Sequence, residues 1–243
     1  MELLGPLDLI IAGWECQGFS AAGGGEGLGD ARSGLFVDMV QVITWAQEIT
    51  PTLGYIIENT PSQFDQREKF QEHFSLVQHY LGAPPLLDAV QCGSYAHRLR
   101  NLWTNLAPLS IFELALKSNI RDPNLQVSQI LDDQSSCQPV TTQEKSQWFS
   151  ANVIGEPRGA WPTLVSFPGA HSFQGDGPGL VYRHLTGTWD EPSPEERERA
   201  MGFQTGTTSR TKVTKLERNA LLGRVMDLNS LIWLLVIFLL FKM

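Results

Sequence analysis

A thiol, a carboxyl group and two guanidinium groups are the side chains whose surroundings best suit chemistry. Cys16 lies in a glycine-rich loop, where the backbone can approach a ligand closely. It could be a nucleophile, although taken alone a buried structural thiol is the commoner reading. Glu58 ends an apolar run, so it could hold a proton near neutral pH and donate it to a ring nitrogen. A strand-end surface carboxylate is the alternative for Glu58.

Basic residues form two candidate binding groups. Arg98 and Arg100 alternate in a strand-like segment and would point to the same side, where they could hold a base edge or a phosphate. The alternative for both is a solvated edge strand. A second group could contact phosphates or form ordinary solvated surface, and comprises Arg210, Lys212, Lys215 and Arg218.

The overall composition limits the possible partners. The 243 residues, 42% apolar and 18% charged, fit one large globular domain with a smaller insert. A net charge of -8 argues against DNA binding by charge alone, although a local basic face is compatible with it. Cys16, Cys92 and Cys137 have no metal-ligand spacing. We therefore expect no metal site and no disulfide framework, and free thiols indicate a reducing compartment.

The positions of these residues follow from the expected secondary structure. Buried strands are predicted over residues 7–13, 53–58, 86–91 and 99–106, and helices over 36–49, with Ser33 as cap and Pro51 as stop, and over 64–80. This alternation predicts a parallel α/β sheet. Reactive residues of such sheets lie beyond the carboxyl ends of strands, so Cys16 and Glu58 should face one crevice.

The rest of the chain divides into two further parts. After a first part of residues 1–106, residues 107–180 lose the apolar period and read as a separate, irregular region. Order returns over residues 181–243, with a helix capped by Ser193 and a last helix from near Thr214 into an apolar tail. The tail's unbroken apolar run is shorter than the ~20 residues of a membrane span, so we expect a buried helix and no membrane. A tail produced by truncation or a shifted reading frame is the alternative.

These features together resemble the cytosine carbon-5 DNA methyltransferase family. Residues 8–36 resemble its catalytic-cysteine block, and residues 57–59 its Glu-Asn-Val block. Residues 94–106 are similar to its double-arginine block, and residues 183–203 and 221–224 to its final blocks. The later blocks are closest to the animal de novo enzymes.

The resemblance implies a partial Rossmann-like class I methyltransferase sheet with an irregular target-recognition insert at residues 107–180. It also implies a mechanism. Cys16 would attack carbon 6 of a flipped-out cytosine. Glu58 would bond ring N3 and the amine, Arg100 would hold the carbonyl oxygen, and Arg98 would support the pocket. Carbon 5 would then take a methyl group from S-adenosylmethionine.

The resemblance further implies contacts and a location. The expected cofactor-binding residues are Asn59, Gly223, Arg224 and Val225. The expected DNA-binding residues are Gln17, Ser20, Arg183, Arg210 and Lys212. DNA and S-adenosylmethionine are the implied partners, and the nucleus is the implied compartment.

The sequence departs from the family in two ways. Glu15 stands where the family has the proline before its cysteine, which loosens the loop. The family's cofactor loop should precede Leu7, so we expect an N-terminally truncated chain with an incomplete cofactor pocket, impaired activity and an exposed sheet edge. The alternative is a non-catalytic homologue, a DNA-binding or regulatory module that pairs with another methyltransferase subunit. A cysteine hydrolase using Cys16 and His97 is a third hypothesis.

Overall fold

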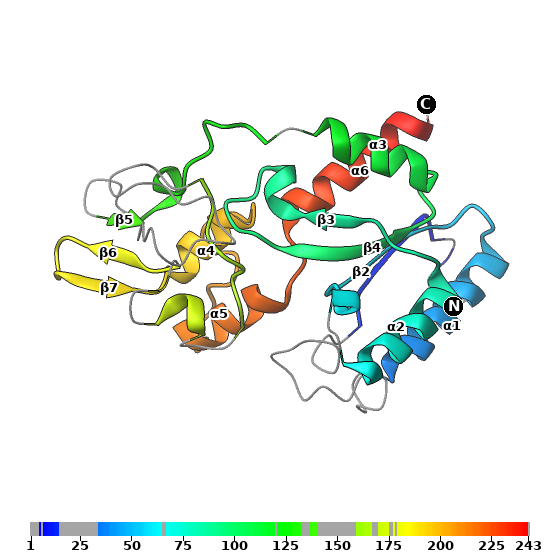
Figure 1. Cartoon of the computed structure of the whole chain (residues 1–243), viewed down its shortest axis with the longest axis horizontal. Coiled ribbons are helices and arrows are strands. Elements are labelled where there is room, and N and C mark those ends of the chain that lie inside the picture. The colour runs from blue at the N-terminus through cyan, green and yellow to red at the C-terminus, as the bar shows by residue number, and fades with distance from the viewer. Residues whose placement is uncertain are drawn as a thin grey trace. The chain divides into compact units, whose positions relative to one another are not determined.

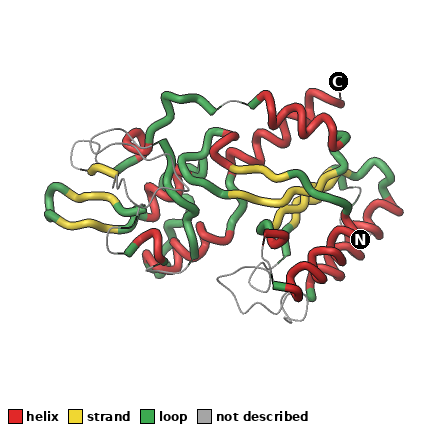
Figure 2. Tube along the Cα trace, in the orientation of Figure 1, coloured by secondary structure: helices red, strands yellow, loops and turns green. Residues whose placement is uncertain are grey.

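The computed structural model describes residues 5, 7–14, 34–64, 67–119, 121–132, 137–139, 159–166, 170–174, 177 and 179–242 (Figures 1 and 2). Cys16 and the rest of its loop lie outside these residues. The chain divides into two compact units. The first comprises Met1–Leu87, Leu99–Ser118 and Ile237–Met243, and the second comprises Asp88–Arg98 and Asn119–Val236.

A four-stranded sheet in the order β1-β2-β4-β3 forms the centre of the first unit. β1 (Leu9–Ala12) pairs with β2 (Gly54–Asn59) in parallel, whereas β2 pairs with β4 (Leu99–Thr104) antiparallel. The prediction of a parallel sheet is therefore right for the first pair and wrong for β4. Two neighbouring strands can be parallel only if a crossover of about a dozen residues or more, usually a helix, connects them. β4 also neighbours β3 (Leu86–Asp88), and the connection between these two strands, residues 89–98, contains only a short 3₁₀ turn. The chain therefore reverses direction before β4.

The predicted strand at residues 86–91 is shorter than expected. β3 covers Leu86–Asp88, and a 3₁₀ helix, η4, follows at Ala89–Cys92. The Asp88 carboxylate accepts a hydrogen bond from the Val90 amide, and the Gln91 side chain accepts one from the Asp88 amide. This reciprocal capping ends the strand, because it draws both residues into a turn.

Helices α1 (Leu35–Ile49) and α2 (Glu68–Leu81) lie together beside the sheet (Figure 1). Their apolar sides pack in one cluster with β1, β2 and β4 that includes Phe36, Ile43, Phe70, Ile57 and Trp103. The helix predicted to begin at residue 64 begins at Glu68, after a 3₁₀ turn, η3 (Ser62–Phe64). The proposed cap Ser33 lies outside the described residues. Helix α3 (Leu109–Ser118) occupies the start of the stretch expected to be irregular.

The second unit has a small antiparallel sheet in the order β5-β6-β7 (Cys137–Pro139, Val181–Arg183 and Thr188–Asp190). It also contains the 3₁₀ helices η5 (Val127–Ile130) and η6 (His171–Phe173) and the helices α4 (Pro194–Ala200) and α5 (Lys215–Arg224). The predicted cap is confirmed, because the Ser193 hydroxyl accepts from the Glu196 amide and Glu196 caps in return. Trp161, Val181, Met201 and Leu222 lie in its buried core.

The C-terminal helix expected to run on from Thr214 is two helices. Residues 225–227 separate α5 from α6 (Leu228–Lys242), and the Asp227 carboxylate accepts from the Ser230 amide at the new start. Only one side of α6 matches the expected buried helix: Leu234 is buried, whereas Leu240 is 68% exposed. By length and composition alone, the stretch Lys215–Leu240 is apolar enough to cross a membrane.

Candidate active site

Glu58 and Arg100, two of the predicted catalytic residues, form an ion pair in the first unit. Glu58 lies opposite Leu102 in the antiparallel register, so Arg100, two residues before Leu102, is on the same face as Glu58. The Arg100 Nε lies 2.7 Å from the Glu58 Oε1, and both side chains are largely buried, at 15% and 18% exposure. A guanidinium and a carboxyl group are thus held together at one end of β2.

The chain that leads toward Cys16 lies beside this end of β2. In the parallel register Ala12 is opposite Ile57, so both strands end at the same edge. The Asn59 Nδ2 donates to the Trp14 carbonyl at 3.0 Å, and its Oδ1 accepts from the Thr60 amide at 2.7 Å. Because Asn59 is buried, these bonds fix residue 14, two before Cys16, against the residue that follows Glu58. Cys16, Gln17 and Ser20 themselves lie outside the described residues.

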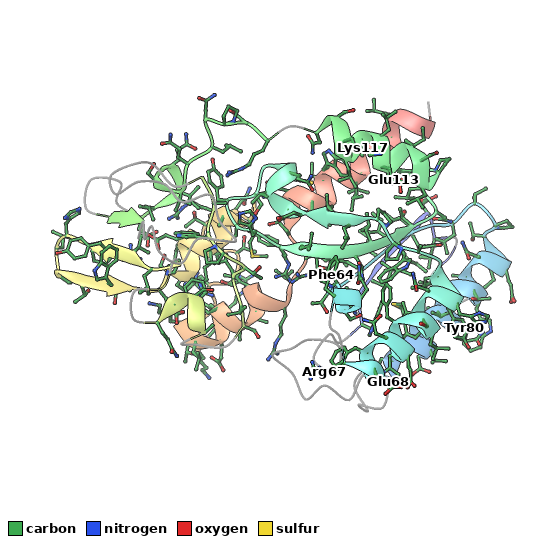
Figure 3. All side chains as sticks on the ribbon, viewed as in Figure 1. Phe64, Arg67, Glu68, Tyr80, Glu113 and Lys117 are labelled. Carbon is green, nitrogen blue, oxygen red and sulfur yellow. The ribbon has the colours of Figure 1, made fainter. Side chains whose placement is uncertain are left out.

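A pair of amide side chains beyond Glu58 was missed by the sequence analysis. The Asn101 Nδ2 donates to the Gln63 Oε1 and the Gln63 Nε2 donates to the Asn101 Oδ1, both at 2.8 Å. This pair fixes η3, which ends at the 57% exposed ring of Phe64 (Figure 3). The asparagine directly before the apolar pair Leu102 and Trp103 is the signal that could have found it, since an amide buried with such neighbours needs a partner.

Arg98 and Gly223, both predicted site residues, meet in the second unit. Both terminal nitrogens of Arg98 lie 3.4 Å from the Gly223 carbonyl oxygen, to which they donate. A Cβ at residue 223 would clash with the backbone of Val165 and Ser166, so α5 can approach that segment only with glycine there. Arg98 is buried, at 6% exposure. It therefore holds the end of α5, and its expected role in supporting a base pocket stays a prediction.

His97, the base of the hydrolase hypothesis, is oriented by Asp88. The His97 Nδ1 lies 2.9 Å from the Asp88 Oδ2, and the Arg98 amide donates to the Asp88 Oδ1 at 2.9 Å. Burial alone would raise the pKa of Asp88, but these hydrogen bonds lower the pKa below its usual value. Asp88 is thus ionised at neutral pH and positions the segment that carries Arg98.

Cys92 has the properties of a structural thiol. Burial raises the pKa of Cys92 to about 12, with Asp227 and Asp88 adding to the effect against a hydrogen bond from Ser230. At neutral pH it is therefore a protonated thiol, and the thiolate is the nucleophilic form. Cys92 is therefore not an alternative to Cys16 as the nucleophile.

The basic residues expected to contact DNA fall into two groups. Arg183 donates to both oxygens of the buried Glu196 at 2.7 Å, and Arg218, 9% exposed, pairs with Glu195 at 2.5 Å and Glu198 at 3.1 Å. Their charges are neutralised inside the second unit, so the expectation that Arg218 forms part of an exposed patch is wrong. Arg210 and Lys212 are exposed in the turn between α4 and α5.

Glu198 holds that turn in place. Its carboxylate accepts from the Gly206 and Thr208 amides, at 2.5 and 2.7 Å, and from the Thr208 hydroxyl. Burial would raise the pKa of Glu198, but these hydrogen bonds and one from Arg218 lower the pKa below its usual value. The loop with Arg210 and Lys212 therefore depends on an ionised, internal carboxylate.

The predicted cofactor-binding residues differ in exposure and in hydrogen bonding. The Asn59 side chain and the Gly223 carbonyl are hydrogen-bonded within the protein, and both positions remain predicted contacts of S-adenosylmethionine. Arg224 and Val225 are exposed at the end of α5 and remain predicted contacts. In the part of the chain that the structure describes, no group of His, Cys, Asp or Glu could hold a metal ion.

Comparison with known proteins decides the family. The sequence model of the C-5 cytosine-specific DNA methylases matches residues 2–153, well over half of the chain. The chain belongs to this family. It is therefore a methyltransferase, and the matched segment carries Cys16, Glu58, Asn59, Arg98 and Arg100.

Solved structures support the class I methyltransferase fold of this family member. The S. pombe Dnmt2 methyltransferase is 17% identical with a TM-score of 0.58, over 96% of this chain and 78% of its own. The Entamoeba histolytica methyltransferase EhMeth is 16% identical with the same score, over 95% and 76%. A DNMT2 variant from Spodoptera frugiperda is 15% identical, scores 0.53 and is matched over 96% and 79%. A search of curated proteins found no match. None of these findings tests the resemblance to the animal de novo enzymes, which stays a prediction.

Proposed function

We propose that this methylase family member transfers a methyl group from S-adenosylmethionine to carbon 5 of cytosine in DNA, with Cys16 as its nucleophile. The observation that carries the proposal is the Glu58–Arg100 ion pair at the strand end where Asn59 bonds the carbonyl of Trp14, two residues before Cys16. A carboxyl and a guanidinium group are the side chains that can bond the N3 edge and the carbonyl oxygen of a cytosine ring.

The reaction uses these groups in sequence. The Cys16 thiolate adds to carbon 6, and the electron pair of the 5,6 double bond moves toward N3 and the carbonyl oxygen. Glu58, carrying a proton for this step, donates a hydrogen bond to N3 and accepts one from the amine, and Arg100 stabilises the charge that develops on the oxygen. Carbon 5 then forms its bond to the methyl group. Loss of the carbon-5 proton to a base reforms the double bond and expels the Cys16 thiolate. S-adenosylmethionine supplies the methyl group as an electrophile and leaves as the neutral thioether.

For this chemistry Glu58 has to take up a proton and bond the ring while it stays beside Arg100. In the structure Arg100 Nε holds one oxygen of Glu58, and the same guanidinium donates to the Leu99 carbonyl at 2.6 Å. The fixed guanidinium lies in place before the base arrives, and such preorganised donors stabilise developing charge without reorganisation. Asn59, Arg98 and Gly223 are positioning residues in this scheme.

The DNA side of the proposal rests on two exposed basic residues and on two polar residues close to Cys16 in the sequence. Arg210 and Lys212 are the proposed phosphate contacts, and Gln17 and Ser20 are proposed to face the flipped base. Arg183 is proposed to act through Glu196 by supporting α4. Residues 107–180 are the proposed target-recognition region, the nucleus is the proposed compartment, and another methyltransferase subunit is a proposed partner.

Methyl transfer to DNA tests the proposal directly. Duplex DNA incubated with the chain and methyl-labelled S-adenosylmethionine should yield 5-methylcytosine on nucleoside mass spectrometry, and Cys16→Ser should abolish it. Label found on adenine would contradict the proposal, and so would the absence of label from carbon 5 of every cytosine. Methylation that survives Cys16→Ser would place the nucleophile elsewhere.

A further inference from the structure

The turn after β2 presents an aromatic ring to solvent near the strand end that carries the Glu58–Arg100 pair. Phe64, the last residue of η3, is 57% exposed and lies six residues beyond Glu58 in the chain. A phenylalanine ring has no polar group that bonds water, and most phenylalanines lie in protein interiors. Ligands of open α/β sheets bind beyond the carboxyl ends of the strands, and η3 follows the carboxyl end of β2. The exposed ring is thus placed where a ligand of this unit would bind.

Hydrogen bonds fix the turn that carries this ring. The reciprocal amide pair of Gln63 and Asn101, with both bonds at 2.8 Å, joins η3 to β4. From α2, the Gln71 side chain donates to the Gln63 carbonyl at 3.0 Å. Asn101 is fully buried and directly follows Arg100 in β4. The backbone next to Phe64 is therefore held against the same strand that carries Arg100, and a site held by buried side chains on regular elements is well positioned for binding.

A guanidinium group follows the ring in the chain. Arg67, the residue directly before α2, is exposed, and its Cζ lies 4.1 Å from the centre of the buried Phe70 ring (Figure 3). This stacking holds the planar group in place. An exposed aromatic ring can stack on a base and a guanidinium can bond a phosphate oxygen, so the two side chains together fit a nucleotide. They fit a purely apolar partner less well, because the charged group would have to be desolvated.

The proposed reaction creates a base face that an exposed ring can cover. When a cytosine is flipped out of the duplex, each neighbouring base loses its stacking partner on the side of the gap. Apolar side chains commonly insert where a protein unstacks a base step. Glu58 is largely buried, whereas Phe64 is largely exposed. The ring is therefore placed for a base next to the target and not for the target cytosine itself.

We infer that Phe64 stacks on a base next to the flipped cytosine and that Arg67 binds a neighbouring phosphate. This stacking subsite, defined as Phe64 with Arg67, rests on the proposed function, because it needs a base flipped out of DNA. The ring stabilises the flipped state of the DNA by covering the base face that flipping exposes. It takes no part in the transfer of the methyl group.

Duplexes with a permanent gap test the stacking subsite without any reaction. In the probe, one cytosine is replaced by an abasic site and its neighbour by 2-aminopurine, whose fluorescence is quenched when it stacks on an aromatic ring. The intact chain should quench this fluorescence and bind the gapped duplex about tenfold more tightly than the intact duplex. Phe64→Leu, which keeps an apolar side chain, should lose both the quenching and the preference. Phe64→Trp should restore both.

Two further variants separate the subsite from general effects on DNA binding. Tyr80→Leu removes a ring of similar exposure, 52%, near the other end of α2 and should leave quenching and preference unchanged (Figure 3). Arg67→Gln should weaken binding of both duplexes and lower the slope of log affinity against log salt by about 1. Urea midpoints of Phe64→Leu and Tyr80→Leu should match that of the parent chain, since both rings lie on the surface.

Three results would overturn the inference alone. They are a parent chain that binds both duplexes equally without quenching, a Phe64→Leu chain that keeps the quenching and the preference, and an equal loss of both in Tyr80→Leu. An unchanged salt slope in Arg67→Gln would overturn the assignment of Arg67. A chain that binds neither duplex would contradict the proposed function as well. Because the probe is bound without a methyl donor, Cys16→Ser should quench it normally, so loss of stacking is distinguishable from loss of methyl transfer.

Discussion

Glu58 is the residue whose environment most directly links structure to chemistry. Replacing it with glutamine keeps its shape but removes the ionisable group and its ion pair with Arg100. We expect Glu58→Gln to slow methyl transfer about 10²- to 10⁴-fold, the usual contribution of a positioned acid. Initial rates with labelled methyl donor measure this. Glu113→Gln, on the exposed side of α3 (Figure 3), is the matched control and should leave the rate unchanged.

A substitution at Arg100 can distinguish the contribution of its positive charge from that of its side-chain geometry. Arg100→Lys retains the positive charge but loses the planar fork that contacts both Glu58 and the Leu99 carbonyl. The expected loss is about 10²-fold in kcat, comparable with removal of one preorganised donor to a developing anion. An Arg100→Lys enzyme with the parent kcat would show that the guanidinium is only a structural partner of Glu58.

Asn59 is expected to act through the backbone of the cysteine loop. Asn59→Asp keeps the acceptor for Thr60 but removes the donor to the Trp14 carbonyl. Loss of this hydrogen bond within buried structure should cost about 1–3 kcal/mol of unfolding free energy, measured by urea denaturation. If Asn59 positions Cys16, attack on cytosine should also slow under conditions where the variant is fully folded. An unchanged attack rate would limit Asn59 to a structural role.

At the scale of elements, the turn between α4 and α5 should depend on pH through Glu198. Its pKa is lowered in the folded protein, so its stabilising effect is complete above the ordinary value of 4.5 and is lost as pH falls through the folded value. Hydrogen exchange of the Gly206 and Thr208 amides should therefore accelerate on acidification below about pH 4.5, relative to the intrinsic rate. Glu198→Gln should show fast exchange at neutral pH. Protection that is independent of pH in the parent would contradict this account.

A substitution at Gly223 tests whether the close approach of α5 to Val165 and Ser166 contributes to stability. Gly223→Ala forces a Cβ into the backbone of Val165 and Ser166 and should destabilise the protein by about 1–3 kcal/mol, as overpacking does. Leu221→Ala, on the exposed side of the same helix, should change stability by less than about 0.5 kcal/mol. Equal effects of the two substitutions in thermal unfolding would show that the approach is not critical.

The elements also show what local sequence could predict. The strands predicted over 7–13 and 53–58, the helix predicted over 36–49 and the Ser193 cap follow from apolar periodicity and capping, which are local signals, and the structure has them within one or two residues of those bounds. The antiparallel direction of β4 depends on the short connection before it, and the 3₁₀ turn after Asp88 and the break before α6 depend on side-chain bonds between particular residues. For the site, alternation predicted that Arg98 and Arg100 would act together. Packing instead gave them different partners, Gly223 and Glu58.

At the scale of the whole molecule, the pairing of arginines with acidic side chains limits the positive charge that this acidic protein can offer to DNA. In the described part of the second unit, Arg183, Arg197, Arg199 and Arg218 are each paired with an acidic side chain. Few cations therefore remain for phosphates. We expect a shallow dependence of DNA affinity on salt, and a slope of log affinity against log salt that falls by about 2 in the double variant Arg210→Ala, Lys212→Ala. A slope unchanged by these substitutions would place the DNA elsewhere.

Covalent capture of the nucleophile tests the central claim most directly. A duplex with 5-fluorocytosine at the target position cannot lose fluorine as it would a proton, so the cysteine adduct accumulates after methyl transfer. With S-adenosylmethionine present, we predict a stable protein–DNA complex in which mass spectrometry places the DNA on Cys16. Cys92→Ser should form the same complex, because burial keeps the Cys92 thiol protonated. No adduct with the parent chain, or an adduct that persists in Cys16→Ser, would contradict the assignment.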